Sequence, residues 1–160
     1  MYFARIPVAS HHENKDKLLE LIDETNSHSI EGISKTDWPL TLGEQKYSQL
    51  FQETVHIAVG QALGAFQYTN TASIKNMWFQ QYSEGDEHDW HYHMDVNWHI
   101  IYYLELPENS PGTELILPGS DLGLTANVNE GDLLMLQPNI RHRSAKNSSS
   151  ERKTIIGMNL

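Results

Sequence analysis

The part of the sequence after residue 70 consists of short runs of β-branched and aromatic residues separated by glycine, proline, asparagine and aspartate. Runs of this kind, bounded by turn-forming residues, are typical of β-strands. A set of short strands that follows helices suggests a jelly roll buttressed by those helices. We expect strands near residues 73–82, 90–95, 99–106, 113–117, 125–128, 132–137, 140–145 and 152–159.

The region before residue 70 predicts two helices. Ser10-His11-His12-Glu13 has the Ser-x-x-Glu form of a capping box, and an amphipathic pattern follows it to about residue 27. Thr41-Leu42-Gly43-Glu44 repeats this form ahead of a second stretch with 3.6-residue apolar spacing. The fold class is therefore mainly β with N-terminal helices: a helical part at about 10–65 and a jelly-roll core at about 70–160, in one domain of residues 1–160.

Composition limits the possible partners and the possible metal ligands. The chain has no cysteine, so a metal ion would be held by imidazole and carboxylate groups. The net charge of −10 repels a phosphate backbone, which makes a nucleic-acid partner unlikely. We expect no membrane association, because no apolar run approaches the roughly 20 residues of a membrane span. With no signal-peptide pattern at the N-terminus, the cytoplasm is the expected compartment.

Histidines gather in one short segment of the chain. Four of the nine histidines fall between His88 and His99. Within this segment His93-Met94-Asp95 would aim an imidazole and a carboxylate to the same side of a strand. His142, the last histidine, could bring a third ligand from a later strand. Two imidazoles and one carboxylate are the ligand set of non-haem Fe(II) sites.

Several motifs occur in an order that resembles the 2-oxoglutarate- and Fe(II)-dependent oxygenases, particularly the small prolyl-hydroxylase-like and phage-type members. The resemblance covers about half of the chain, from about Met77 to Leu160. It implies a double-stranded β-helix that binds Fe(II) through His93, Asp95 and His142. The motifs are Trp78-Phe79-Gln80-Gln81-Tyr82, Gly85, His93-Met94-Asp95, Ile101-Tyr102-Tyr103-Leu104, Gly112-Thr113-Glu114-Leu115, Gly131-Asp132-Leu133-Leu134, His142 and Arg152.

The same resemblance implies a site for 2-oxoglutarate. Arg152 lies ten positions after His142, where the family places a basic residue that pairs with the far carboxylate of the cosubstrate. Thr154 would lie on the same strand face as Arg152, and Tyr82 and Tyr103 occupy positions where relatives place hydroxyls near the cosubstrate. The implied reaction is hydroxylation of a C–H bond by dioxygen, with release of succinate and CO2. The expected substrate is a peptide, with a prolyl residue as one option, or a small molecule.

Three alternatives remain open from the sequence. His91 lies two residues before His93, so it could replace Asp95 as a metal ligand; we prefer Asp95 because it supplies an anion. A metal-dependent cupin that does not use 2-oxoglutarate would share the jelly roll, and the spacing of Gly85 and His91 matches the opening of a cupin motif. A metal-free β-sandwich binding module would instead use the histidines to contact a ligand.

Overall fold

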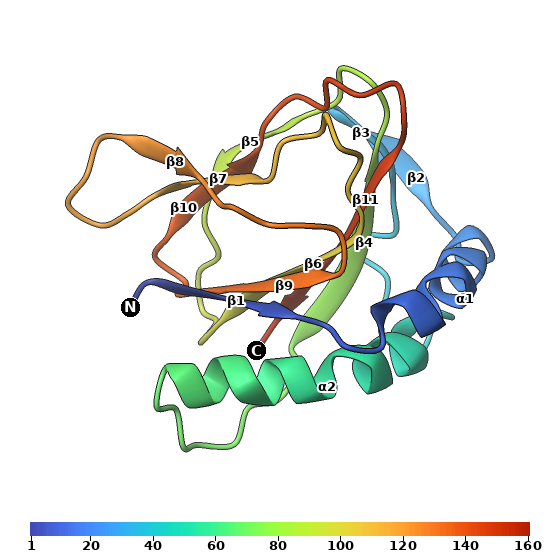
Figure 1. Ribbon diagram of the computed structural model, residues 1–160. Coiled ribbons are helices and arrows are strands. Elements are labelled where there is room, and N and C mark those ends of the chain that lie inside the picture. Colours follow the sequence, from blue (N-terminus) through green and yellow to red (C-terminus); the bar gives the residue numbers. More distant parts are fainter.

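A computed structural model describes all residues, 1–160, and consists of two β-sheets and two helices (Figure 1). All paired strands are antiparallel. The larger sheet has the order β1-β9-β6-β11-β4-β3-β2 and the smaller sheet β5-β10-β7-β8, so the expected jelly roll is confirmed. The strands are β1 (Phe3–Pro7), β2 (His28–Ile30), β3 (Ile33–Thr36), β4 (Asn76–Tyr82), β5 (His88–His91), β6 (His99–Glu105), β7 (Thr113–Ile116), β8 (Gly123–Thr125), β9 (Asp132–Leu136), β10 (Arg141–Ser144) and β11 (Lys153–Asn159).

The eight strands expected from the sequence correspond to β4 through β11. The sequence did not predict β1, β2 and β3. β1 contains an arginine and a proline and alternates only weakly between buried and exposed positions, and β2 is exposed throughout. One difference matters for function: the strand expected at 90–95 ends at His91, so residues 92–95 form an irregular segment.

The two expected helices are present: α1 begins directly after Ser10, as its motif predicts, whereas α2 begins several residues after the Thr41–Glu44 motif. α1 spans His11–Asp23, and the Ser10 hydroxyl donates to the carbonyl of Thr54 in the second helix instead of capping α1. α2 spans Ser48–Ala65. The Glu44 carboxylate accepts hydrogen bonds from the Thr41 N–H (2.8 Å) and hydroxyl (2.7 Å), which closes a turn ahead of α2. Neither helix is long and apolar enough to cross a membrane.

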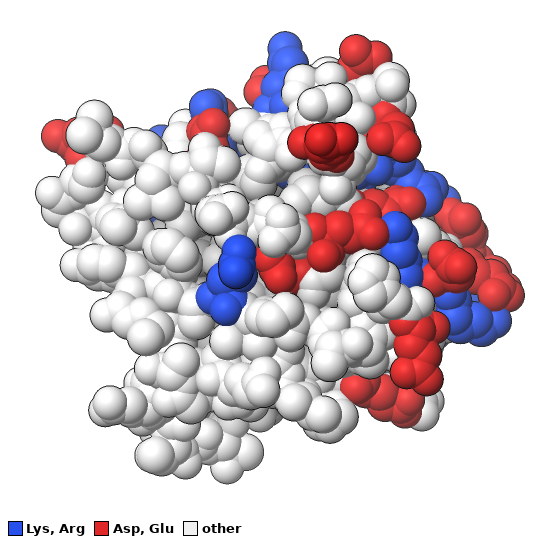
Figure 2. All heavy atoms as spheres, in the orientation of Figure 1, with Lys and Arg blue, Asp and Glu red and all other residues white.

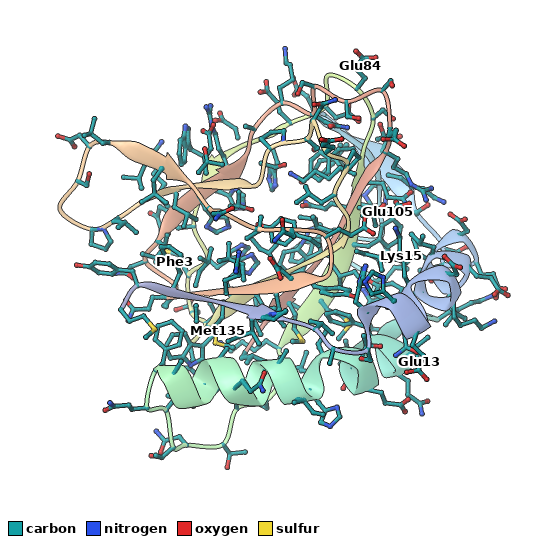
Figure 3. The ribbon with its side chains drawn as sticks, in the orientation of Figure 1. Phe3, Glu13, Lys15, Glu84, Glu105 and Met135 are labelled. Carbon is teal, nitrogen blue, oxygen red and sulfur yellow. The ribbon has the colours of Figure 1, made fainter.

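The larger sheet separates two apolar layers. In β9, Leu133 and Met135 face the helices, whereas Leu134 and Leu136 face the smaller sheet. Figure 3 shows Met135 in the layer between the sheet and α2. Because strand side chains alternate, β9 is buried on both faces and holds the two layers together. The second layer, between the two sheets, is the interior that carries the candidate site.

Candidate metal centre

Three histidines come together between the two sheets. His91 ends β5, His93 follows in the irregular segment, and His142 lies in β10. Their ligand nitrogens all lie within 4.8 Å of one another. His91 and His142 are direct partners in the β5–β10 ladder, which fixes their spacing through the backbone.

The hydrogen bonds of these histidines leave nitrogen lone pairs available for a metal ion. The Nδ1–H of His91 donates to the Asp89 carbonyl (2.7 Å), and that of His142 donates to the Ile140 carbonyl (3.0 Å). Both hydrogen bonds place the proton on Nδ1, so Nε2 keeps its lone pair. The Nε2 atoms of His93 and His142 are buried and have no hydrogen-bond partner. A buried polar atom without a partner is costly, and a metal ion at this position would satisfy both nitrogens.

Burial keeps these rings in the neutral form that metal ligation requires. Loss of solvation, followed by the neighbouring His91, lowers the pKa of His93 to about 4 and that of His142 to about 3. Loss of solvation also lowers the pKa of His91. At neutral pH the cluster therefore presents uncharged imidazoles. The residues fit a divalent transition metal that accepts nitrogen ligands, such as Fe(II).

Asp95, which the sequence favoured as a ligand, lies outside this group. It is exposed, has a φ of 60°, and lines a surface hollow with Tyr92, Met94 and Pro138. The alternation that would have aimed residues 93 and 95 to one side requires a continuous strand, and β5 ends at His91. The structure thus brings together His91, His93 and His142 and leaves the carboxylate of Asp95 apart.

Two more histidines pack against the three. His99 is buried, and its ring stacks on His93 with a centroid distance of 3.8 Å. The Nδ1–H of His99 donates to the Asn159 side-chain oxygen (2.8 Å), which fixes the ring from behind. His88 stacks on His91 at 4.1 Å. The sequence analysis grouped His88 and His99 with the other histidines but assigned a role to neither.

A buried lysine lies in the same interior. Lys153 is 1% exposed, and its Nζ donates to the Pro111 carbonyl (2.9 Å) and the Ser144 hydroxyl (3.1 Å). Its Nζ also lies 5.6 Å from the centre of the Tyr82 ring. No carboxylate pairs with Lys153, and burial lowers its pKa to about 8. Ser144 and Tyr82 line the same cavity as His91 and His142.

Arg152, the cation expected from the sequence, points away from this cavity. Its guanidinium donates to the Glu105 carboxylate from Nε (2.8 Å) and Nη2 (3.0 Å), and the Thr154 hydroxyl donates to the same carboxylate. Glu105 and Arg152 line an outer groove with Lys15 of α1 (Figure 3). In β11 the inward positions are Lys153, Ile155 and Gly157, so the inward face is the one opposite to that expected.

The two tyrosines expected near the cosubstrate, Tyr82 and Tyr103, are both buried in the interior. Tyr82 lines the cavity, and its hydroxyl donates to the Gln80 side-chain oxygen (2.7 Å). Tyr103 shares a hydrogen bond with the Thr113 hydroxyl (2.7 Å), and Thr113 lines the cavity as well. Burial raises the pKa of both phenols, so they remain protonated donors at neutral pH.

The sequence analysis did not favour two residues that the structure brings into this interior. His91 was placed second to Asp95 on the ground of charge, and Lys153 was passed over for its neighbour Arg152. The period-2 pattern of β11 contained a usable signal for Lys153: it shares a strand face with Ile155 and Gly157. Arg152 lies on the same side of the strand as Thr154, whose hydroxyl donates to Glu105 on the outer side. This alternation would have placed Arg152 outside if the sequence showed which face of β11 is the outer one.

No model of a known protein family matches the sequence, and no curated protein matches it. Solved structures do match. A 2OG-Fe(II) oxygenase family oxidoreductase from Burkholderia pseudomallei aligns over 98% of this chain and 82% of its own, with a TM-score of 0.71 and 9% identity. A Pseudomonas putida prolyl-4-hydroxylase aligns over 98% and 91%, with a TM-score of 0.69 and 12% identity. The viral collagen prolyl hydroxylase of Paramecium Bursaria Chlorella virus-1 aligns over 99% and 94%, with a TM-score of 0.64 and 16% identity.

These similarities extend over nearly the whole chain, and each of these three structures is an oxygenase or a hydroxylase. The resemblance noted in the sequence motifs is thereby found in the architecture as well. The chain has the fold of the 2-oxoglutarate- and Fe(II)-dependent oxygenases.

Proposed function

We propose that this protein is a 2-oxoglutarate- and Fe(II)-dependent oxygenase that hydroxylates a C–H bond of a peptide or small molecule. One observation carries the proposal: the buried Lys153 ammonium has no carboxylate partner and donates to the Ser144 hydroxyl, and Ser144 lines a cavity with His142, whose Nε2 lacks a partner. Such a cavity offers a metal site and a carboxylate site inside one barrel. That is what binding of 2-oxoglutarate to iron requires.

In this proposal His91, His93 and His142 hold the metal ion. The support is their mutual approach within 4.8 Å and the two unpartnered Nε2 atoms. Three imidazoles on one side leave the other coordination positions for cosubstrate and dioxygen. The ligand set differs from the expected His93, Asp95 and His142 by one exchange, His91 for Asp95.

Lys153 would bind the carboxylate of 2-oxoglutarate that lies far from the metal. An unpaired ammonium in a desolvated cavity gains a strong charge-assisted contact when a carboxylate enters. The Thr113 hydroxyl lies in the same cavity and could donate a further hydrogen bond. Arg152 and Thr154 then serve the structure, because they bind Glu105 on the outer side of β11.

The residues of the chain have defined tasks in this reaction. Bound Fe(II) together with 2-oxoglutarate would supply the oxygen chemistry: one oxygen atom enters succinate, the other enters the substrate C–H bond, and CO2 leaves. Lys153 and the histidines orient the cosubstrate. Tyr82, Tyr103 and Ile101 enclose the cavity, which keeps bulk water from the reacting centre.

Two other functions fit fewer observations. A cupin-type metal enzyme that does not use 2-oxoglutarate would account for the histidines as metal ligands. It would leave the buried charge of Lys153 without a carboxylate partner. A metal-free binding module would leave the Nε2 atoms of His93 and His142 unsatisfied. Both alternatives make distinct experimental predictions.

The deciding experiment measures succinate from the purified protein with Fe(II), 2-oxoglutarate and oxygen, with and without a panel of peptides and metabolites. Alongside it, calorimetry measures 2-oxoglutarate binding to the Mn(II)-loaded protein under anaerobic conditions. We expect binding that disappears in His142→Ala and weakens strongly in Lys153→Met. Metal binding with no 2-oxoglutarate binding would favour the cupin alternative, and no metal binding at all would favour the binding module.

A further inference from the structure

Among the three proposed metal ligands, His93 alone has no hydrogen bond that fixes its ring. His91 donates to the Asp89 carbonyl and His142 to the Ile140 carbonyl. Metal-binding histidines usually have such a partner on the second ring nitrogen, because it sets the orientation of the ring. The His93 side chain makes no hydrogen bond, and its backbone lies in the irregular segment after β5. Neither a strand ladder nor a hydrogen bond therefore orients this ring.

Aromatic contacts take the place of the missing hydrogen bond. The ring of His99 stacks on that of His93 with a centroid distance of 3.8 Å and an interplanar angle of 24°. Trp78 also contacts His93, but at 5.6 Å and 40°. His99 lies nearly parallel to His142 as well, at 5.0 Å and 17°. The face of His99 thus covers the face of His93, and close packing of this kind resists tilting of the ring.

The ring of His99 is itself held in place by the larger sheet. His99 is 3% exposed, and its Nδ1–H donates to the side-chain oxygen of Asn159 (2.8 Å). The Asn159 amide donates in turn to the side-chain oxygen of Asn76 (2.9 Å). Asn159 is the direct ladder partner of both His99 and Asn76, so the three side chains form a row across β6, β11 and β4. Three paired strands therefore determine the position of the His99 ring.

We propose that His99 is a positioning residue of the metal centre, whose fixed ring sets the plane of the His93 ring. The inference rests on the proposed function, in which His93 binds a metal ion. His99 is not assigned as a ligand, because the group of nitrogens that lie within 4.8 Å of one another consists of His91, His93 and His142. A ligand that is already oriented loses little side-chain freedom when the metal binds, so this contact should raise metal affinity.

The first measurement uses the metal-free protein and follows the motion of the His93 ring. In protein with 13C-labelled histidine, NMR relaxation of the ring carbon Cε1 gives an order parameter for the side chain. We expect a restricted ring in the wild type and a clearly lower order parameter in His99→Leu, which removes the flat surface. His99→Phe, which keeps a flat ring, should leave the order parameter of His93 close to that of the wild type.

The second measurement is Mn(II) affinity by calorimetry. Figure 2 shows acidic side chains gathered over α1 and at the upper end of the face, and such groups can bind Mn(II) weakly. His142→Ala, which lacks a proposed ligand but keeps this surface, therefore supplies the background to be subtracted. We expect His99→Leu to weaken specific binding roughly tenfold or more, whereas His99→Phe should stay within about threefold of the wild type.

A variant of the supporting row tests the same role without a change at position 99. Asn159→Leu leaves the buried Nδ1–H of His99 without an acceptor, which is costly, so the ring is expected to turn toward another partner. The order parameter of His93 and the Mn(II) affinity should then both fall, as in His99→Leu. This variant decides the question if the His99 variants do not fold.

A core variant controls for loss of stability alone. Leu18→Ala opens a cavity in the layer between the helices and the larger sheet, and it should change neither the order of His93 nor the Mn(II) affinity. The inference is overturned if His93 stays ordered in His99→Leu and Asn159→Leu, or if His99→Phe or Leu18→Ala loosens it as much as His99→Leu does. A wild-type protein that binds no Mn(II) would instead overturn the proposed function, so the two failures are distinguishable.

Discussion

His91 and His142 face each other as direct partners across β5 and β10, with a ring-centroid distance of 4.4 Å. A backbone ladder thus sets the distance between two proposed ligands, and the third, His93, comes from the irregular segment that follows β5. The proposed metal site therefore depends on the place where β5 ends.

The first prediction compares His91 with Asp95. We expect His91→Ala to lose most of its affinity for Mn(II) or Fe(II), because two ligands remain of three. Asp95→Ala should keep the affinity, because this exposed side chain lies outside the group. Calorimetry with Mn(II), together with circular dichroism as a check of folding, measures both. Loss of metal in Asp95→Ala with retention in His91→Ala would restore the ligand set first expected from the sequence.

The second prediction compares Lys153, the first residue of β11, with the preceding cation Arg152. Lys153→Met removes the buried ammonium, and loss of a charge-assisted contact in a desolvated site should weaken 2-oxoglutarate binding by at least about 30-fold. Arg152→Gln is the matched control, since its guanidinium binds Glu105 outside the cavity. Metal affinity should be the same in both variants. Equal 2-oxoglutarate affinities in the two variants would remove Lys153 from the site.

The third prediction concerns pH. Burial lowers the pKa of Lys153 to about 8 in the free protein, and a bound carboxylate would raise it again. The free protein therefore loses the ammonium as the pH rises above about 8, and the 2-oxoglutarate affinity should fall there by up to tenfold per pH unit. Lys153→Arg, whose guanidinium stays charged, should bind with little change over the same range. A wild-type affinity that is constant from pH 7 to 9.5 would contradict this assignment.

The fourth prediction concerns the contribution of the buried carboxylate of Asp37 to the free energy of unfolding. Asp37 is fully buried and accepts hydrogen bonds from the Phe79 N–H (2.8 Å), the Gln45 amide (2.9 Å) and the Tyr47 hydroxyl (2.8 Å). Asp37→Ala would leave these buried donors unpaired, so we expect a loss of about 3 kcal/mol or more in the free energy of unfolding.

Urea denaturation measures this loss. Asp121→Ala, which removes an exposed carboxylate from the loop between β7 and β8, is the control and should stay within about 0.5 kcal/mol of wild type. An Asp37→Ala variant as stable as the control would mean that water replaces the lost acceptor.

Much of the fold could be predicted because its signals are local. β4 through β11 follow from short apolar runs between turn residues, and α1 and α2 follow from apolar spacing. β1 was missed because it pairs with β9, a strand far along the chain, from Phe3↔Leu136 to Pro7↔Asp132. A pairing between segments so far apart leaves no mark in a short window of sequence.

The site was harder to predict than the fold because it depends on strand ends and strand facing. A shift of one residue turns every side chain of a strand to its other face, so Arg152 and Lys153 exchange roles according to how β11 lies on β4 and β6. Likewise, the alternation that would have placed Asp95 on the same side as His93 stops with β5 at His91. Both features are set by contacts with other strands, which neither composition nor spacing records.

β5 has a neighbour on one side only, and the residues paired with β10 are two of its histidines, His88 and His91. An edge strand with so few pairs separates readily from its neighbour. An ion bound by both His91 and His142 would therefore stabilise the pairing of β5 with β10. Part of the intrinsic metal affinity would then go into ordering this strand. Chelation is expected to speed amide hydrogen exchange in β5 while β9, paired on both sides by β1 and β6, keeps its protection.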